Sequence, residues 1–142
     1  MRYLLDSNVL RYYTAKHPTL TQNLARIPAA QIGLPLVVVI EQLRGRFDAY
    51  LKAEPENLLR EQTRLLAAQQ FLSHYQTVYA DEATVAALTS LRQRVSTRKR
   101  YADVVIAALA LAAGDIVVTR NVEDFRDLLP AAQIQNWVDQ VY

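Results

Sequence analysis

The stretch Tyr-Ala-Asp-Val-Val-Ile-Ala-Ala-Leu-Ala-Leu-Ala-Ala-Gly-Asp-Ile-Val-Val-Thr, residues 101–119, decides the fold class of this chain. Residues 101–113 are apolar almost all round, which is typical of a helix buried between other elements. Gly114 is the natural residue to end this helix, because glycine readily adopts the left-handed conformation found at helix C-termini. Residues 115–119 are rich in β-branched side chains and are the best candidate for a strand. A buried helix that leads into a buried strand predicts an α/β fold.

The same alternation of strands and helices extends outward to both ends of the chain. The predicted strands are 3–5, 31–34, 77–79 and 133–135, and the predicted helices are 8–16, 19–26, 55–75 and 81–96. Residues 37–40 are ambiguous, because their β-branched side chains favour a strand whereas Pro35 favours the start of a helix. Alternation of this kind predicts a small parallel sheet with helices on both faces. We therefore expect one three-layer α/β/α domain over residues 1–142.

Apolar periodicity assigns a buried face to two of these helices. In the 55–75 helix, leucines recur every seven residues and predict core packing; they are Leu58, Leu65 and Leu72, accompanied by Leu59 and Leu66. In the 81–96 helix the corresponding apolar residues are Val85, Leu88, Leu91 and Val95.

Composition excludes several kinds of chemistry. The chain has 142 residues, 51% hydrophobic and 21% charged, which is typical of a globular domain and not of a disordered one. It has no cysteine, which excludes disulfides, thiol nucleophiles and cysteine-bound zinc. Two histidines and three glycines leave little for a histidine-rich metal site or a glycine-rich phosphate loop. The 16 basic and 14 acidic residues give a net charge of +2, and the chemistry that remains available is that of carboxylates.

No targeting or membrane segment is apparent in the sequence. The longest uncharged apolar stretch, 104–114, is far shorter than the roughly 20 residues that a membrane-spanning helix needs. The N-terminus reaches a charge too soon for a signal peptide. We expect a cytoplasmic protein without a membrane partner.

Four carboxylates fall where the predicted strands end. Asp6 follows the first strand, Glu41 follows residues 37–40, Asp103 opens the buried helix, and Asp124 lies just beyond the 115–119 strand. Active sites of parallel sheets form at the carboxyl ends of the strands, so the fold can gather all four acids. Clustered carboxylates repel one another unless cations neutralise them, and Mg²⁺ or Mn²⁺ is the usual partner of such oxygen ligands.

Each carboxylate also has a purely structural interpretation. Asp6 can cap a helix, Glu41 can be a solvated residue in a first helical turn, and Asp103 can be a favourable charge near a helix N-terminus. Asp124 has acidic neighbours, as surface residues often do. The joint placement of the four acids therefore carries the prediction.

Four stretches of the chain resemble PIN-domain nucleases, and in particular the VapC-type toxins. They are Tyr-Leu-Leu-Asp-Ser-Asn-Val-Leu (3–10), Val-Val-Ile-Glu-Gln-Leu-Arg-Gly (38–45), Ala-Asp-Val-Val-Ile-Ala-Ala-Leu-Ala (102–110) and Val-Val-Thr-Arg-Asn-Val-Glu-Asp-Phe (117–125). The end of the chain, from Leu129 to Trp137, is similar to the last strand of those toxins. The resemblance covers essentially the whole chain.

The resemblance implies a metal-dependent endoribonuclease. It places Asp6, Glu41, Asp103 and Asp124 in the family's acidic metal-binding cluster, where they serve as catalytic residues and ligands of Mg²⁺ or Mn²⁺. It places Ser7, Asn8, Thr119 and Asn121 at polar supporting positions. It further implies a structured RNA substrate such as a tRNA or a ribosomal RNA, inhibition by a VapB-type antitoxin, and a homodimer.

The segment before Asp103 departs from the family pattern. Many VapC-type toxins have a loop with glycine and proline there, whereas this chain has Ser-Thr-Arg-Lys-Arg-Tyr over residues 96–101. With Arg92 and Arg94, the cations Arg98, Lys99 and Arg100 form a basic run without an acid. Such a run predicts contacts to RNA phosphates, but it also suits a solvated helix end.

Three other functions are compatible with a small α/β domain that has an acidic pocket. A PIN-fold nuclease can process RNA outside a toxin system, and a PIN-fold domain can bind RNA or a protein without cleaving. A receiver-like phosphoacceptor domain is a weaker alternative, because it needs adjacent acids after the first strand and a lysine after the last core strand. Here Ser7 follows Asp6, and Arg120 follows Thr119.

Overall fold

The computed structural model describes all residues, 1–142, and contains a five-stranded sheet. The strands are β1 (Tyr3–Leu5), β2 (Ile32–Pro35), β3 (Gln76–Val78), β4 (Ile116–Val118) and β5 (Ile134–Gln135). Their order across the sheet is β3-β2-β1-β4-β5, and every neighbouring pair is parallel. The predicted parallel α/β fold is confirmed.

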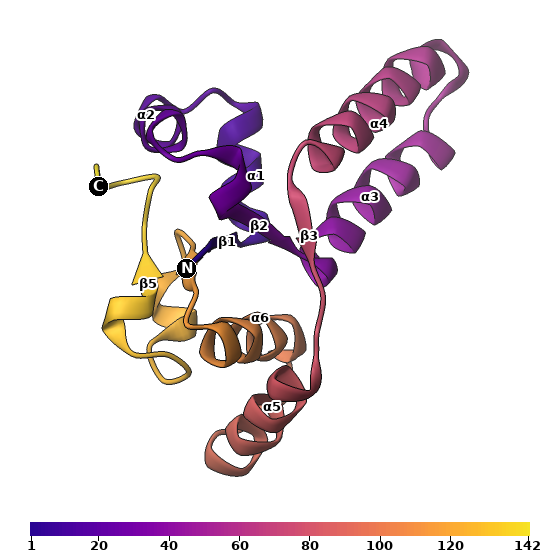
Figure 1. The fold of residues 1–142 in the computed structure, drawn as a ribbon. Helices are drawn as coiled ribbons and strands as arrows, with labels where there is room; N and C mark the ends of the chain where they lie inside the picture. The colour runs from indigo at the N-terminus through magenta and orange to yellow at the C-terminus, as the bar shows by residue number, and fades with distance from the viewer.

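Six helices surround this sheet. They are α1 (Ser7–Thr14), α2 (Pro18–Arg26), α3 (Leu36–Leu51), α4 (Leu58–Ser73), α5 (Glu82–Arg94) and α6 (Tyr101–Ala113). Short 3₁₀ turns join them at η1 (Ala29–Gln31), η2 (Pro55–Asn57), η3 (Val122–Phe125) and η4 (Ala131–Gln133). Helices α1 and α2 lie on one side of the sheet and α5 and α6 on the other, while the α3–α4 hairpin projects outward (Figure 1).

The segment that decides the fold class forms the elements predicted from its sequence. Helix α6 has the predicted bounds, and six of its residues are buried. Gly114 ends the helix with a φ of +69°, in the left-handed region that favours glycine. The chain then enters β4, whose three residues are all buried between β1 and β5.

The ambiguous segment 37–40 is helical. Pro35 ends β2 and precedes the first residue of α3, and its φ of −53° suits the entry into a helix. Only Val38 of this segment is buried, whereas Ile40 is 46% exposed. One buried residue in four is the pattern of a half-exposed helix rather than of a core strand, so the start signal from the proline decides the structure.

The leucine repeat of the 55–75 helix is mostly outside the core, which makes the predicted burial wrong. Leu72 is buried, but Leu58, Leu59 and Leu66 are 38%, 73% and 50% exposed. Helix α4 packs against α3 and not along the sheet, so only its C-terminal end reaches the core (Figure 1). Val85 of α5 is likewise exposed rather than buried.

A single cluster of 23 buried apolar residues forms the core. It runs from Leu4 and Leu5 of β1, through β4 and α6, to Phe125 and Trp137 near the C-terminus. This core fixes the carboxyl edge of β1 and β4 rigidly, and the candidate site lies there. None of the helices has the length and apolar character required to span a membrane.

Candidate acidic cleft

A polar cleft of about 710 Å³ opens where the parallel strands end. Asp6 directly follows β1, Glu41 lies in the second turn of α3 beyond β2, and Asp103 lies in the first turn of α6. Helix α6 leads into the start of β4, so its own first turn lies at the opposite edge, where β4 ends. All three carboxylates line this cleft.

Asp6 is the most constrained of the three acids. It is only 6% exposed and caps α1, with Oδ1 accepting the backbone N–H of Ser7 at 2.8 Å. Its Oδ2 accepts the Asn8 amide and the Thr119 hydroxyl, both at 2.9 Å. Because Oδ2 already accepts two hydrogen bonds and Oδ1 only one, Oδ1 keeps a lone pair for a further ligand. The cap and the site role are therefore compatible in one side chain.

The charge of Asp6 is nevertheless disfavoured. Burial raises the pKa of its carboxyl, and hydrogen bonds from Thr119 and Ser7 lower it again. The charges of Glu41 and Asp124 raise this pKa further. The donors hold the geometry of Asp6, but they are neutral and do not cancel its charge.

Asp103 is half-buried and forms neither a hydrogen bond nor an ion pair in the structure. Burial raises the pKa of its carboxyl to about 6, with further contributions from the charges of Asp6 and Asp124. Arg100 opposes the shift from three residues away, but its guanidinium binds Asp127 instead. A carboxylate in this state gains from any cation that enters the cleft.

The remaining predicted site residues take two kinds of position. Thr119 is fully buried beneath Asp6, and its Oγ1 also accepts the backbone N–H of Asn121. Asn121 therefore supports the site through its backbone, and its side chain makes no hydrogen bond to the acids. Asp124 is exposed and lines a neighbouring cleft of about 790 Å³, which meets the first one at Asn121.

The acids of the cleft differ from the other buried acids of the chain. Asp115 is buried and bound by the backbone and guanidinium of Arg2, with the closest ion-pair distance 2.9 Å. Glu61 is buried and pairs with Arg60 and Arg64. Asp6 and Asp103, by contrast, have no cationic side chain bound to them. Among acids that are not solvent-exposed, these two alone lack an arginine or lysine partner.

This donor set fits a hard divalent cation. The available ligands are all carboxylate oxygens, and their uncompensated repulsion favours Mg²⁺ or Mn²⁺. No three acidic or histidine side chains are spaced to hold an ion by themselves. Mg²⁺ does not require three such side chains, because it usually keeps several waters and takes one or two carboxylates together with phosphate oxygens of a substrate.

Two arginines that the sequence did not single out also line the cleft. Arg11 of α1 and Arg46 of α3 lie on its rim beside the acids, and neither pairs with a carboxylate. Neither belongs to a motif or a run of charges, so in a sequence each is indistinguishable from a solvated surface residue. Only the packing of α1 beside α3 brings them together.

The predicted basic run divides into two parts. Arg100 is tied down: it binds both carboxylate oxygens of Asp127, at 2.7 and 2.8 Å, and the carbonyl of Asp124 at 2.7 Å. Arg98 and Lys99 are exposed and have no polar partner. The run therefore offers two available cations beside the first turn of α6.

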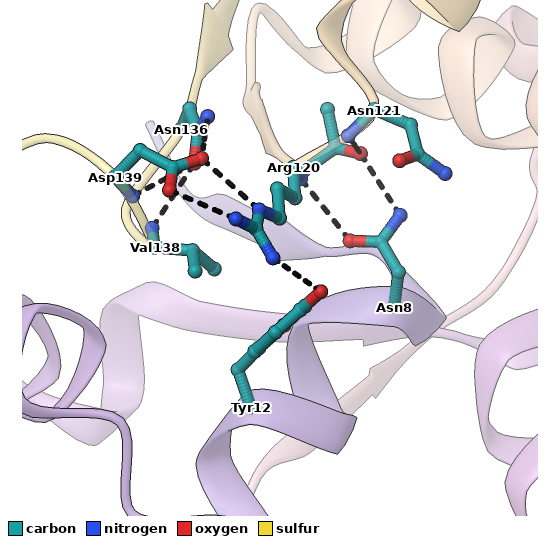
Figure 2. Close-up of polar contacts among 8 residues, drawn as sticks. Asn8, Tyr12, Arg120, Asn121, Asn136, Val138 and Asp139 are labelled. Atoms are coloured by element: carbon teal, nitrogen blue, oxygen red, sulfur yellow. Dashed lines mark hydrogen bonds and ion pairs between the residues drawn. The ribbon is translucent and has the colours of Figure 1, made fainter.

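A second polar network is centred on Arg120 (Figure 2). The backbone N–H of Arg120 donates to Oδ1 of Asn8 at 3.1 Å, and the guanidinium of Arg120 donates to Asp139 and to the hydroxyl of Tyr12. Asn136 in turn donates to Asp139 at 2.8 Å. The network joins the C-terminal segment to α1.

The fold and the cleft together define a class of protein: a parallel α/β domain with unneutralised carboxylates at the carboxyl ends of its strands. Within that class, the family model described as PIN domain matches residues 3–128. The chain belongs to the PIN domain family. No curated protein matches the chain significantly.

Solved structures of similar fold cover nearly the whole chain. A DNA-bound VapBC from Salmonella typhimurium matches with a TM-score of 0.75 and 19% identity, over 96% of this chain and 98% of the other. VapBC2 from Rickettsia felis, bound to a promoter DNA fragment, matches at 0.70 and 24%, over 96% and 99%. A toxin–antitoxin complex from Klebsiella pneumoniae matches at 0.69 and 19%, over 95% and 97%. At these identities the likeness establishes the PIN-like fold.

Proposed function

We propose that this protein is a divalent-metal-dependent endoribonuclease and the toxin of a VapBC-type toxin–antitoxin pair. One observation carries the proposal: the buried Asp6 and the half-buried Asp103 lie in one cleft without a cationic partner, whereas the other buried acids, Asp115 and Glu61, are paired with arginines. Uncompensated charge of this kind is disfavoured in a structural role, but it is useful for binding a metal ion.

In this proposal the residues have distinct roles. Asp6 and Asp103 hold Mg²⁺ or Mn²⁺, while Glu41 and Asp124 complete the acidic cluster, directly or through water. When bound, the ion activates the phosphodiester and the attacking water as a Lewis acid. Asn8 and Thr119 fix the orientation of Asp6 through its Oδ2. Attack by water on phosphorus with departure of the 3′-oxygen yields a 5′-phosphate and a 3′-hydroxyl.

The cations around the cleft define how RNA approaches. Arg98 and Lys99 lie in the loop before α6, and Arg11 and Arg46 line the cleft. Lysine and arginine contacts to phosphates provide affinity that does not depend on sequence. These four side chains support an RNA substrate, for which a structured tRNA or ribosomal RNA is the proposed class. Such a substrate implies action in the cytoplasm.

The partner that we propose is a VapB-type antitoxin. The structures with a similar fold come from VapBC and toxin–antitoxin complexes. The α3–α4 hairpin carries exposed apolar side chains, as expected of an interface; they are Phe47, Leu51, Leu59 and Leu66. A hairpin of this kind also provides the surface for the proposed homodimer. Residues 1–142 act as one PIN domain in this proposal, supported by the single core cluster.

The proposal is tested by incubating the purified protein with total RNA in Mg²⁺, Mn²⁺ or EDTA and sequencing the 5′ ends. We expect cleavage at few sites with either ion and none in EDTA. Asp103→Asn keeps the shape of the side chain and removes its charge, so it is expected to abolish cleavage while retaining the fold. Asp127→Asn is the matched control, because it neutralises an exposed acid near the cleft that belongs to an ion pair.

Two outcomes contradict the proposal. Cleavage by the Asp103→Asn variant at the wild-type rate excludes the assigned site. An absence of cleavage in either ion, combined with retained RNA binding, identifies a binding domain instead of a nuclease. The toxin role is tested separately, by expressing the protein with and without the product of an adjacent antitoxin-like reading frame and measuring growth.

A further inference from the structure

We infer that Arg120 and Asp139 are positioning residues that hold the amide of Asn8, and through it the Asp6 carboxylate, in the orientation that a metal ion requires. This inference deepens the proposed metal-dependent function and rests on it. It gives the C-terminal segment, residues 136–142, a role in the site, although that segment contributes no carboxylate to the cleft.

Arg120 fastens α1 at two points. Its backbone N–H binds the Asn8 side chain at 3.1 Å, and its guanidinium binds the hydroxyl of Tyr12. The guanidinium carbon also lies 4.8 Å from the centre of the Tyr12 ring. Asn8 and Tyr12 are four residues apart, so the two contacts lie one helical turn apart on one face of α1 (Figure 2). This pairing fixes both the position and the rotation of α1 against the end of β4.

The contact with Asn8 determines which way its amide faces. Oδ1 of Asn8 accepts the Arg120 N–H, while Nδ2 donates to Asp6 at 2.9 Å and to Thr119 at 3.2 Å. If the amide were reversed, its oxygen would face the carboxylate of Asp6 and its N–H₂ would face the N–H of Arg120. These hydrogen bonds would be lost, and the facing groups would repel each other. The Arg120 N–H therefore selects the donor orientation of Asn8 that holds the Asp6 carboxylate in place through its Oδ2.

Asp139 anchors the other end of Arg120. Its two carboxylate oxygens accept the guanidinium at 3.1 and 3.2 Å, in a bidentate geometry that resists rotation. Asn136 binds the same carboxylate at 2.8 Å, and its Oδ1 accepts the backbone N–H groups of Val138 and Asp139. Asn23 of α2 in turn holds the segment through the backbone of Trp137, Gln140 and Tyr142. The anchor is thus rigid, even though the ion pair itself is exposed.

An exposed ion pair contributes little to global stability, which makes the inference testable without unfolding the protein. The variants are Arg120→Met and Asp139→Asn, and Arg126→Met is the charge-matched control for Arg120→Met. Arg126 also belongs to an exposed ion pair near the cleft, at 2.8 Å from Glu123, but it has no contact with Asn8. Direct Mn²⁺ titration, thermal melting and the NMR signals of the Asn8 side-chain amide are measured for each.

We expect both positioning variants to weaken Mn²⁺ binding by about tenfold, the low end for residues behind a metal ligand. We expect a matching loss in kcat with little change in KM for RNA, and a melting temperature close to that of the control. The Asn8 amide signals are expected to shift in both variants and to stay unchanged in Arg126→Met. Arg120→Lys keeps the charge without the bidentate geometry and is expected to restore binding only in part.

The positioning role and the proposed metal-dependent function are contradicted by different results. If the wild-type protein binds Mn²⁺ and the positioning variants bind it equally well, the positioning role is wrong and the metal site stands. If the wild-type protein binds no Mn²⁺, the proposed function is wrong. Even then the NMR measurement decides whether the Arg120–Asp139 ion pair positions Asn8 through the Arg120 backbone, because unchanged Asn8 signals in both variants overturn the inference.

Discussion

The negative charge of Asp103 opposes folding as long as no cation is bound. Burial, followed by the charges of Asp6 and Asp124, raises the pKa of this carboxyl from 3.8 to about 6. Between these two values the folded state binds more protons than the unfolded state does. The stability of the metal-free protein attributable to this group therefore falls as the pH rises through that window.

The first prediction concerns the pH dependence of Asp103→Asn. Because the variant cannot ionise, we expect it to melt at a higher temperature than the wild type in EDTA at pH 7. The difference is expected to shrink as the pH falls through about 6 toward 3.8. Thermal denaturation at closely spaced pH values measures it. Saturating Mn²⁺ is expected to stabilise the wild type more than the variant, which reverses the order.

Asp127 provides a control, because its pKa is shifted in the opposite direction to that of Asp103. Its hydrogen bonds with Arg100 lower the pKa of this carboxyl, so its ionised form stabilises the fold above the ordinary pKa, and this stabilisation is lost at lower pH. Asp127→Asn is therefore expected to destabilise the protein at pH 7. An Asp103→Asn difference that does not vary with pH contradicts the assigned burial of that carboxylate.

The site residues differ in how well their role could be predicted from the neighbouring sequence. Asp6 and Asp103 could be proposed because each stands next to an apolar element whose end is visible in the sequence. Arg120 and Asp139 could not be paired, because no periodicity relates them and their contact depends on the path of the C-terminal segment. Tertiary packing decides which surface charges become part of a site.

At the scale of elements, the loop between α5 and α6 illustrates how a charge run divides. Arg94 binds the carbonyls of Asp127 and Leu128, and Arg100 binds the Asp127 side chain, so these two cations on either side of the loop are part of the framework. Arg98 and Lys99 between them remain available for a ligand. The basic run is thus both a helix-end structure and a candidate phosphate contact.

The second prediction separates these two roles. Arg98→Ala with Lys99→Ala is expected to weaken RNA binding and to reduce the slope of log K against log salt by roughly 1.4 to 1.8, because two phosphate contacts are lost. Filter binding of the Asp103→Asn background at several salt concentrations measures the slope. Lys52→Ala, at the far end of α3, is the control and is expected to leave the slope unchanged. An unchanged slope in the double variant assigns the loop to structure alone.

The third prediction tests how tightly side chains of the neighbouring strands pack around Gly33. A Cβ at Gly33 of β2 meets Cγ2 of the buried Val78 at 2.6 Å and Cδ2 of Leu4 at 3.1 Å. We expect Gly33→Ala to destabilise the protein by about 1 to 3 kcal/mol through overpacking. Gly45→Ala is the matched control: nothing lies within 4 Å of its Cβ, and alanine in a helix is favoured by about 0.5 to 1 kcal/mol. Urea denaturation compares the two, and equal stability of both variants contradicts the packing described.

Element types were more predictable than buried faces, for a physical reason. Gly114 acts on the neighbouring backbone, so its effect can be inferred locally, whereas Pro35 precedes a β-branched run that left the sequence prediction for residues 37–40 open. The leucines of α4 show helical periodicity whether they face a core or a partner, because any interface selects the same apolar stripe. Only the position of the hairpin relative to the sheet distinguishes the two cases (Figure 1).

At the scale of the whole molecule, apolar surface is concentrated on the hairpin away from the acidic cleft's floor. Phe47, Leu51, Leu59 and Leu66 are each at least half exposed on α3 and α4. Exposed apolar groups contribute little to the stability of the monomer, but burying them against another chain is favourable. The hairpin is thus a surface suited to binding another chain, and its helix α3 also contributes Glu41 and Arg46 to the cleft.

The last prediction tests whether the α3–α4 hairpin is an interface. Leu59→Ser with Leu66→Ser removes two exposed side chains, so we expect the melting temperature of the free protein to change little. Each buried leucine contributes about 1.5 kcal/mol or more to an interface, so binding of the co-expressed antitoxin or of a second copy is expected to weaken roughly hundredfold. Val85→Ser on α5 is the control, because Val85 is also 58% exposed but lies across the sheet from the hairpin. Sedimentation velocity of each variant, alone and with the antitoxin, measures both interactions. If the double variant retains both while Val85→Ser loses one, the interface lies on the α5 face and the hairpin is merely solvent-exposed.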